Sequence, residues 1–294
     1  MTESSGAQSE ARFLFFNGEI LPADRPLFSG SDLAILRGYG VFDFFRVEMG
    51  TPLFFDEYMD RFFRSAGLLG LQVPMSREAI AETIGTLLEA NHRETGRIRI
   101  VLTGGDSPDG FSPGRENLMM LYHPPIVLPE EPAGIKVLTH QHERELPGAK
   151  TLNYLTAVQG LPRMRSAEAS ELLYHDGHRV LEAARANVFL LTPDGILATP
   201  GDRMLPGITR NRVLTVCRQA SSLPGIVGVA ERDIALSELR SAREVFLTGS
   251  GRFLMPVVDI DGSPVGDGRV GPVCRLLFGL LREDSRAYLK AVKA

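Results

Sequence analysis

Several features that mark other classes of protein are missing from this chain of 294 residues. Its two cysteines, Cys217 and Cys274, stand apart in apolar stretches, so the sequence has neither a disulfide framework nor a cysteine metal motif. It has no basic runs, and 32 basic against 36 acidic residues leave a net charge of −4, which argues against a nucleic-acid partner. No apolar run is long enough to span a bilayer, and the polar first ten residues lack the apolar segment of a signal peptide. We therefore expect a cytoplasmic protein that binds neither nucleic acid nor a membrane.

The sequence does contain many short strand patterns mixed with amphipathic helices. Helical periodicity is found at residues 56–71, 76–91 and 208–220 and from Gly271 onwards. Strand patterns occur at residues 13–21 around Asn17-Gly18, 41–55 around Met49-Gly50, 97–103, 117–122, 135–139, 171–174, 180–182, 187–192, 196–199 and 245–248, with further tight turns at Asp194-Gly195 and Asp261-Gly262. This scattered order predicts an α+β fold rather than a doubly wound sheet.

A proline-rich stretch divides the chain. His123-Pro-Pro is followed at residues 129–134 by Pro-Glu-Glu-Pro-Ala-Gly, which favours an extended connector. We place a small α/β domain at residues 1–124, the connector at 125–134 and a larger C-terminal domain at 135–294. A Gly/Pro-rich loop at residues 104–114 is long enough to carry function or to move.

The stretch from Glu145 to Tyr154 is the centre of the functional hypothesis. Lys150 follows a Pro-Gly turn signal, small and apolar residues flank it, and the residues after it, 151–158, favour a helix. Burial disfavours the ammonium form of lysine, so a lysine in such a setting can act as a free amine that attacks a carbonyl. Taken alone, the stretch is explained as simply by a surface lysine at the end of a loop.

Three other stretches have features of anion sites. Leu205-Pro-Gly-Ile-Thr209 leads from a turn into a helix, which leaves the amides of Ile208 and Thr209 available to a phosphate. In the second stretch, Phe246-Leu-Thr-Gly-Ser250, a predicted strand ends in hydroxyl residues and a glycine. A loop that faces a phosphate has this composition. Arg61 stands on a largely apolar helix. Each has a simpler alternative when taken alone, namely an ordinary turn or a solvated arginine.

Two further candidates concern a buried charge and a metal. Glu182 lies between an apolar strand and small residues, where a carboxylate needs a partner, either a protonated ring nitrogen or Arg179 or Arg185. His140 and His142 share one face of a strand, as two metal ligands would. No Cys or His cluster completes such a site, so hydrogen-bonded or solvated histidines are favoured and no metal is expected.

Together these parts specify pyridoxal phosphate, which needs an amine for its aldehyde, a carboxylate for its pyridinium and several phosphate anchors. In order and wording the stretches resemble the fold-type IV (class IV) pyridoxal-phosphate aminotransferases, which include branched-chain aminotransferases, D-amino-acid aminotransferases and aminodeoxychorismate lyases. The resemblance is carried by the run from Glu182 to Phe189, by Asp194-Gly195 and by Leu205-Pro-Gly-Ile-Thr-Arg. It implies a two-domain α+β fold with a C-terminal pseudo-barrel and a site between the domains. It also implies a homodimer in which a loop of the neighbouring subunit helps to close the site.

The resemblance assigns roles by motif. Lys150 resembles the Schiff-base lysine that also shuttles the proton, Glu182 the partner of the pyridine nitrogen, and Arg61 the phosphate arginine. It implies further cofactor contacts for Tyr154 near the ring oxygen, for Leu205 against the ring, and for Ile208, Thr209 and Ser250 at the phosphate.

The chain departs from the well-known members at the substrate side. Phe42-Asp43-Phe44 stands where branched-chain enzymes usually have Phe-Glu-Gly, and Gly104 follows the strand that carries a late arginine in the best-known D-amino-acid enzymes. An α-carboxylate is best held by a guanidinium. A less usual subgroup of D-amino-acid transaminases, with another arginine set, resembles this chain in the stretches Ile35-Leu-Arg-Gly-Tyr-Gly-Val-Phe-Asp43, Val101-Leu-Thr-Gly-Gly-Asp-Ser-Pro-Asp-Gly110 and Arg144-Glu-Leu-Pro147. The arginines that offer a clamp are Arg37, on a predicted loop, and Arg185, expected to be buried beside the cofactor, and after them Arg99 and Arg252.

We therefore expect ping-pong transamination between a D-amino acid and a 2-keto acid such as 2-oxoglutarate or pyruvate. Three alternatives stay open: a branched-chain L-amino-acid aminotransferase, an aminodeoxychorismate lyase, and a protein that binds pyridoxal phosphate without turnover. The pairing of Lys150 with Glu182 argues against the last, because mere retention of the cofactor does not need an electron sink.

Overall fold

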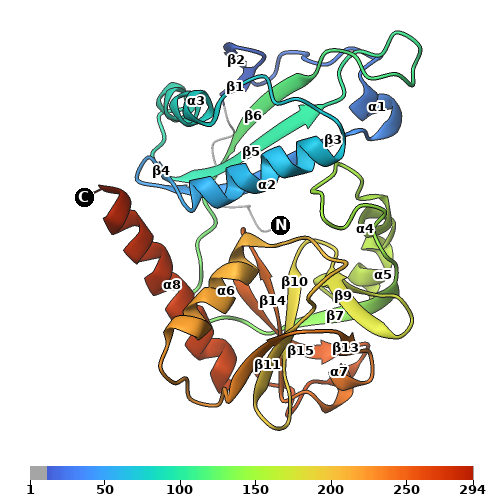
Figure 1. Ribbon diagram of the computed structural model, residues 1–294, viewed down its shortest axis with the longest axis vertical. Coiled ribbons are helices and arrows are strands. Elements are labelled where there is room, and N and C mark those ends of the chain that lie inside the picture. Colours follow the sequence, from blue (N-terminus) through green and yellow to red (C-terminus); the bar gives the residue numbers. More distant parts are fainter. Residues whose placement is uncertain (1–11, 294) are drawn as a thin grey trace, which may run out of the picture. The chain divides into compact units, whose positions relative to one another are not determined.

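In the computed structural model, which describes residues 12–293, the N-terminal part of the chain forms a six-stranded antiparallel sheet (Figure 1). The predicted Asn17-Gly18 hairpin is confirmed, with φ of 47° and 101° at these residues. The strands lie in the order β2-β1-β6-β5-β3-β4. Their bounds are β1 (Phe13–Phe16), β2 (Glu19–Pro22), β3 (Gly40–Glu48), β4 (Thr51–Pro52), β5 (Gly96–Thr103) and β6 (Asn117–His123).

Helices α2 (Phe55–Leu68) and α3 (Arg77–Ala90) pack against this sheet. Strand β3 buries alternate residues, as expected for a sheet with one covered face, and the ring of Phe45 lies 5.3 Å from that of Tyr58 in α2. Both helix predictions are confirmed, although α2 ends at Leu68. Ser76 caps α3 by accepting a hydrogen bond from the amide of Ala79 at 3.2 Å.

A short helix, α1 (Leu33–Arg37), was not predicted. Asp32 begins it by accepting a hydrogen bond from the amide of Ala34 at 2.7 Å, and Gly38 ends it with φ of 65°. Arg37 is therefore the last residue of a helix. The prediction that it lies on a loop is wrong.

The C-terminal part of the chain forms a mixed, curled pseudo-barrel sheet of ten strands. Strand β7 pairs in parallel with both β8 and β15, while most other pairs are antiparallel. The order is β12-β11-β10-β14-β15-β7-β8-β9-β13, with β16 beside β15. The bounds are β7 (Ile135–Gln141), β8 (Glu171–His175), β9 (Arg179–Ala183), β10 (Asn187–Leu191), β11 (Ile196–Thr199), β12 (Gly228–Glu231), β13 (Ile234–Ala235), β14 (Glu244–Gly249), β15 (Phe253–Ile260) and β16 (Ser263–Pro264). The α+β prediction is confirmed.

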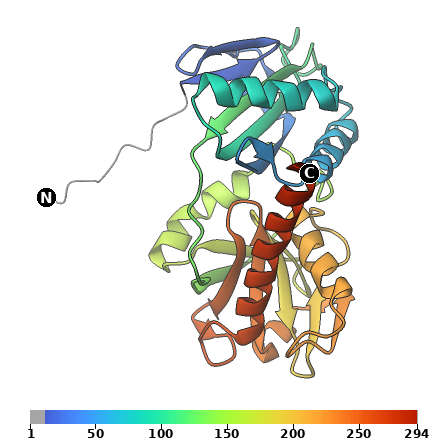
Figure 2. The ribbon, with the colours of Figure 1, turned by 90° about the vertical axis from the view of Figure 1, so that its left-hand side faces the viewer.

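Helices α6 (Ile208–Gln219) and α8 (Pro272–Lys293) pack against each other and on this second sheet, and Figure 2 shows α8 running along it. Phe189 and Phe246 stack with ring centroids 5.0 Å apart in the core below these helices, and Leu247 faces a second core on the other side. Three short helices complete this part: α4 (Leu155–Gln159), α5 (Leu161–Ser166) and α7 (Glu238–Ser241).

The chain forms two compact units and passes between them more than once. The first unit contains the residues up to Val127 and, in addition, Ala149–Asn153. The second contains Leu128–Gly148 and the residues from Tyr154 onwards. The change at residue 127 falls within the predicted connector, but the return at Ala149 was not foreseen. The helix expected at residues 151–158 begins only at Leu155, because Thr151 pairs with Val41 of β3.

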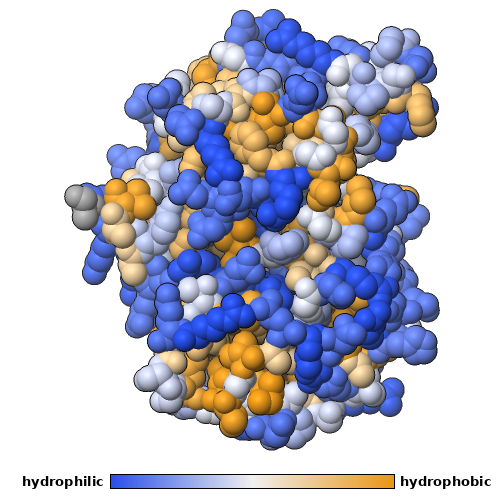
Figure 3. All heavy atoms as spheres, in the orientation of Figure 1, coloured by the Kyte–Doolittle hydropathy of each residue, from blue (hydrophilic) through white to orange (hydrophobic). Residues whose placement is uncertain are grey.

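The outer surface is mixed in character. On the face shown in Figure 3, hydrophilic residues surround several hydrophobic patches of different size. No helix among residues 12–293 is both long and apolar enough to cross a membrane. The polar N-terminal stretch discussed above lies outside the described residues.

Candidate active site

Lys150 lies on a short extended segment at the edge of β3. The amide of Phe42 donates a hydrogen bond to the carbonyl of Lys150 at 2.9 Å, and the amide of Lys150 donates to Oγ of Ser65 in α2 at 3.1 Å. Partners in an antiparallel pair direct their side chains to the same face. Accordingly, Nζ of Lys150 is 4.6 Å from the ring centroid of Phe42. The backbone of Lys150 is thus held by two hydrogen bonds, and its amine lies over an aromatic ring.

Arg61 is buried and forms a two-pronged ion pair with Asp43. Its Nε and Nη2 donate to the two carboxylate oxygens at 2.9 Å and 2.6 Å, and Asp43 also accepts the amide of Phe44 at 2.7 Å. A planar guanidinium held by two such bonds has a fixed orientation. Sequence reasoning treated Asp43 only as a departure from a motif and missed this contact. The available signal was an aspartate at a buried position of an alternating strand.

Arg99 lies on the same face of the sheet as Phe42. Its Cζ is 5.6 Å from the ring centroid of Phe42 and 5.3 Å from that of Phe44. Arg97 lies beside it, and burial together with Arg99 lowers the pKa of Arg97. Burial and the two arginines lower the pKa of His123 to about 4. This crowding of positive groups favours an anion on this face.

Arg37 is exposed in α1, and its Nη1 donates to the carbonyl of Leu36 at 2.9 Å. The nearby loop at residues 104–114 is ordered by Asp109, which accepts the amides of Phe111 and Ser112 at 2.9 Å and 2.6 Å. The arginine is therefore displayed at the surface of the first unit, next to a structured loop.

In the second unit, Glu182 is buried on β9 and paired with Arg144. Nε of Arg144 donates to Oε1 of Glu182 at 2.8 Å, and the amide of Leu205 donates to Oε2 at 3.0 Å. The alternative pairings expected from sequence are wrong, because Arg179 pairs with Asp233 and Asp176, and Arg185 with Glu171. Arg144 is the partner that sequence reasoning missed. The cation and the amide stabilise the buried negative charge of Glu182, and a buried negative charge is what a protonated ring nitrogen requires as its partner.

Helix α6 begins in a tight turn with no side-chain cap. Nδ2 of Asn187 donates to the carbonyl of Leu205 at 2.7 Å. A Cβ on Gly207 would lie 1.8 Å from Oδ1 of Asn187, so only glycine allows this close approach. The first amides of α6, at Ile208 and Thr209, lack acceptors within the helix, and together with the helix dipole they suit a phosphate.

Gly207→Ala is expected to disturb this turn. The added methyl group must displace the side chain of Asn187, and overpacking of this kind costs about 1–3 kcal/mol of stability. We expect weaker cofactor binding as well, measured by titration, with stability measured by urea unfolding. Gly201→Ala is the matched control, since its Cβ would meet nothing closer than 3.6 Å. Equal behaviour of the two variants would show that the close approach is unimportant.

The remaining predicted residues of the second unit lie at its surface or partly buried. The side chain of Arg185 is 58% exposed, and its Nε donates to Glu171 at 3.0 Å. The expectation that Arg185 is buried beside the cofactor is therefore wrong, and the arginine pairs with an acidic neighbour instead. Burial raises the pKa of Glu171, while Arg185 and then Arg252 act against that rise, so both arginines lie near one carboxylate.

Tyr154 and Ser250 are partly buried, the first directly before α4 and the second directly after β14. Burial above all raises the pKa of Tyr174 to about 12, and Glu182 and Tyr154 contribute to the rise. The phenol of Tyr154 and the carboxylate of Glu182 therefore both lie near Tyr174.

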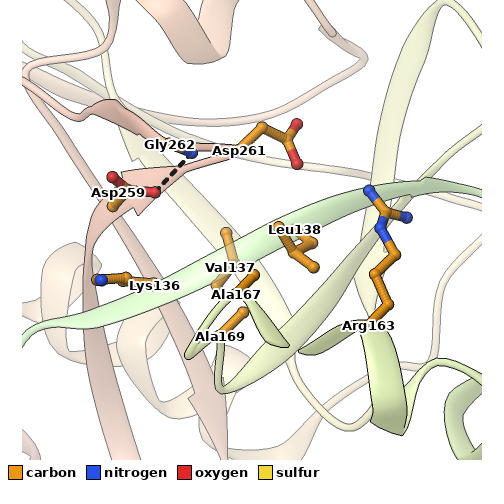
Figure 4. A pocket seen from close by; sticks show the side chains of 9 residues that line it. All are labelled: Lys136, Val137, Leu138, Arg163, Ala167, Ala169, Asp259, Asp261 and Gly262. Atoms are coloured by element: carbon orange, nitrogen blue, oxygen red, sulfur yellow. Dashed lines mark hydrogen bonds between the residues drawn. The ribbon is translucent and has the colours of Figure 1, made fainter. Parts of the chain in front are cut away.

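No group of three or more His, Cys, Asp or Glu side chains within the described part of the chain could hold a metal ion. The ring of His142 packs against Tyr174 at 4.7 Å instead. A pocket of about 460 Å³ in the second unit is lined by charged residues such as Lys136 and Arg163 and by apolar ones, and none of the predicted site residues lines it (Figure 4).

Comparison with known proteins decides the family. Residues 40–260 match the family model described as "Amino-transferase class IV". The chain belongs to the class IV aminotransferases. It is 30% identical over 271 residues to the D-alanine aminotransferase of Staphylococcus haemolyticus, covering 90% of this chain and 94% of that one. It is 32% identical to branched-chain-amino-acid aminotransferase-like protein 1 of Arabidopsis thaliana, covering 91% of this chain and 50% of that protein.

A solved structure of the same family supports the fold. The branched-chain amino acid aminotransferase of Escherichia coli superimposes with a TM-score of 0.80 at 26% identity, covering 92% of this chain and 92% of that one. Another solved branched-chain amino acid aminotransferase contains pyridoxamine 5′-phosphate. Class IV aminotransferases use pyridoxal phosphate, and this chain is accordingly a pyridoxal-phosphate enzyme. The uncapped start of α6, the contact between Gly207 and Asn187, and the buried Glu182 fit the phosphate and the ring of that cofactor.

Proposed function

We propose that this aminotransferase takes its amino group from a D-amino acid and passes it to a 2-keto acid such as 2-oxoglutarate or pyruvate, in a ping-pong sequence. The observation that carries the proposal is the position of Arg99. Its guanidinium and the amine of Lys150 both lie against the ring of Phe42, at 5.6 Å and 4.6 Å from its centroid. A substrate amine that reacts beside Lys150 therefore has a guanidinium on the same face for its carboxylate.

We further propose roles for the residues around the cofactor. The bound cofactor supplies an aldehyde and a ring that accepts electrons. Lys150 supplies the amine and moves the substrate proton. Glu182, held by Arg144, supplies the negative charge for the ring nitrogen, and Arg61, whose orientation Asp43 fixes, serves as the phosphate arginine. The remaining contacts are those of Tyr154 with the ring oxygen, Leu205 with the ring, and Ile208, Thr209 and Ser250 with the phosphate.

The choice of a D-amino acid is supported by relatives such as the D-alanine aminotransferase of Staphylococcus haemolyticus. It is tested by measuring keto-acid formation from matched D and L forms of alanine, glutamate and leucine, with 2-oxoglutarate as acceptor. We expect kcat/KM to be higher for the D form of each pair. A preference for L-leucine over D-alanine would instead establish a branched-chain L-amino-acid enzyme, which the structural similarity to branched-chain aminotransferases favours.

Arg99→Met is expected to reduce kcat/KM for amino acids by about 10- to 100-fold, because a hydrogen bond to a charged group contributes about 1.5–3 kcal/mol. Turnover of an amine without a carboxylate should change far less. Arg282→Met is a matched control, since Arg282 also lies over a phenylalanine ring, at 5.9 Å from that of Phe278. The same assay applied to Arg37→Met, Arg185→Met and Arg252→Met shows whether these arginines share the task.

If Arg99→Met impairs amines and amino acids equally, Arg99 has a structural role and the proposed carboxylate site is wrong. Among the other candidates, Arg185 already has an anion partner in Glu171. A loss of activity in its variant accompanied by a loss of stability would mean that it supports the fold and does not contact substrate.

We also propose that the enzyme is a homodimer. Exposed apolar side chains on α4, with Leu155 at 64% and Val158 at 59% exposure, are suited to a contact with another chain. Light scattering after size-exclusion chromatography should give twice the chain mass of 32.2 kDa. A monomeric mass at micromolar concentration would exclude the dimer.

A further inference from the structure

Thr248, near the end of β14, has an unusual hydroxyl group. The residue is 1% exposed, and within the described part of the chain its Oγ1 has no hydrogen-bond partner. Buried hydroxyls in folded proteins almost always have one. Thr199 on the same sheet is also buried, and its hydroxyl donates to the carbonyl of Val188 at 2.8 Å. Thr248 therefore differs from a comparable threonine of the same sheet, and its hydroxyl is available to a bound group.

The strand register places this hydroxyl beside the start of α6. Thr248 is directly opposite Asn187 in the antiparallel pair of β14 and β10, so the two side chains lie on the same face with Cβ atoms about 4.5–5.5 Å apart. Asn187 contacts the turn before α6, through the carbonyl of Leu205 at 2.7 Å and the close approach to Gly207. The hydroxyl of Thr248 thus lies on the side of the sheet where α6 begins.

The surroundings leave little else for this hydroxyl to bind. Two positions along the strand, Phe246 stacks on Phe189 in the apolar core beneath α6 and α8. Thr248 and Asn187 are polar residues that lie between this apolar core and the turn that precedes α6. The carbonyl of Leu205 is already engaged by Asn187, and α6 has no side-chain cap. An uncapped helix start beside a buried hydroxyl of this kind calls for an external acceptor.

We propose that the hydroxyl of Thr248 donates a hydrogen bond to the phosphate of the cofactor at the start of α6. Phosphate oxygens are strong acceptors, and a hydroxyl that approaches them from the sheet complements the amides that approach from the helix. The inference rests on the proposed phosphate-binding site at the amides of Ile208 and Thr209. It adds Thr248 of β14 to that site, two residues before Ser250.

Thr248→Val tests the proposal because it removes the hydroxyl and keeps the shape of the side chain. Since the hydroxyl has no partner in the cofactor-free protein, that form should be as stable as the wild type or more stable. Its affinity for pyridoxal phosphate should fall about tenfold. Affinity for pyridoxal, which lacks the phosphate, should not change, and the stabilisation of the cofactor-free protein by inorganic phosphate should become smaller.

Two controls separate this role from a general effect. Thr248→Ser keeps the hydroxyl and should retain most of the affinity. Thr199→Val removes a hydroxyl that has a partner, so it should destabilise the cofactor-free protein and leave the affinity for pyridoxal phosphate intact. Equal affinities of the wild type and Thr248→Val for pyridoxal phosphate would overturn the inference alone. If the wild type does not bind pyridoxal phosphate, the proposed phosphate-binding site at the start of α6 is wrong as well.

Discussion

Lys150→Ala is expected to abolish amino-group transfer and to remove the long-wavelength absorption of the bound cofactor. The amine of Lys150 is the group we propose to join the cofactor and to move the substrate proton. Proton transfer by a positioned side chain alone contributes about 10²–10⁴-fold to a rate, so the loss should be at least of that size. The backbone contacts of Lys150 with Phe42 and Ser65 do not involve the side chain. The variant should therefore fold and still bind the cofactor through its phosphate.

Two measurements distinguish lost chemistry from lost structure. Lys136→Ala removes an exposed lysine paired with Glu168 at 3.1 Å and should leave the rate and the spectrum unchanged. A small primary amine added to Lys150→Ala should restore part of the proton transfer and hence some turnover. Turnover within a few-fold of the wild type, without added amine, would rule out Lys150 as the reactive lysine.

Glu182→Gln is expected to slow the half-reaction with the amino acid by about 10²–10³-fold, the loss that follows removal of one preorganised electrostatic contact in an active site. The substitution keeps the shape of the side chain and removes its charge. Cofactor affinity should fall much less than the rate, since the phosphate contacts remain. Single-turnover measurements with a D-amino acid and cofactor titrations give the two quantities separately.

The contact of Glu182 with Arg144 adds a second effect. Breaking a buried ion pair from one side destabilises a protein by about 3–5 kcal/mol, and Arg144 is only 13% exposed. The double variant Glu182→Gln, Arg144→Gln should therefore recover stability without recovering the rate. Glu244→Gln is the matched control, because Glu244 is buried and accepts the amides of Val273 and Cys274 at the start of α8. If Glu182→Gln retains the wild-type rate, its carboxylate serves only the salt bridge.

Local signals in the sequence were sufficient for much of the architecture. The turns at Asn17-Gly18 and Asp261-Gly262 adopt positive φ at both residues, as their short-range chemistry predicts. Helix α6 begins at Ile208, directly after the Pro-Gly turn. Asp194-Gly195 likewise joins β10 to β11. At each of these turns the conformation depends on residues that are adjacent in the chain, and the turn directly adjoins a strand or helix with a periodic apolar pattern.

Contacts between distant residues could not be predicted in this way. Glu182 and Arg144 are 38 positions apart, and Asp43 and Arg61 are 18 apart. The sequence showed that Glu182 needs a partner, but several arginines were available to it, and only the pairing of β7, β8 and β9 brings the segment of Arg144 to it. For the same reason, the helix expected after Lys150 starts late. The carbonyl of Lys150 and the amide of Leu152 bond to β3, and these tertiary contacts override local helical preference.

The return of Ala149–Asn153 to the first unit has a consequence for the order of folding. Strand β3 leaves the ribosome long before residue 149, and the amide of Phe42 and the carbonyl of Gly40 find their partners only in Lys150 and Leu152. Until then β3 presents an incomplete edge, which is where sheets associate wrongly with other chains. The segment that carries Lys150, the lysine that we propose to be reactive, also completes this edge. Residues 149–153 therefore cover this part of β3 and supply Lys150 together, and a fragment that stops at the connector has neither.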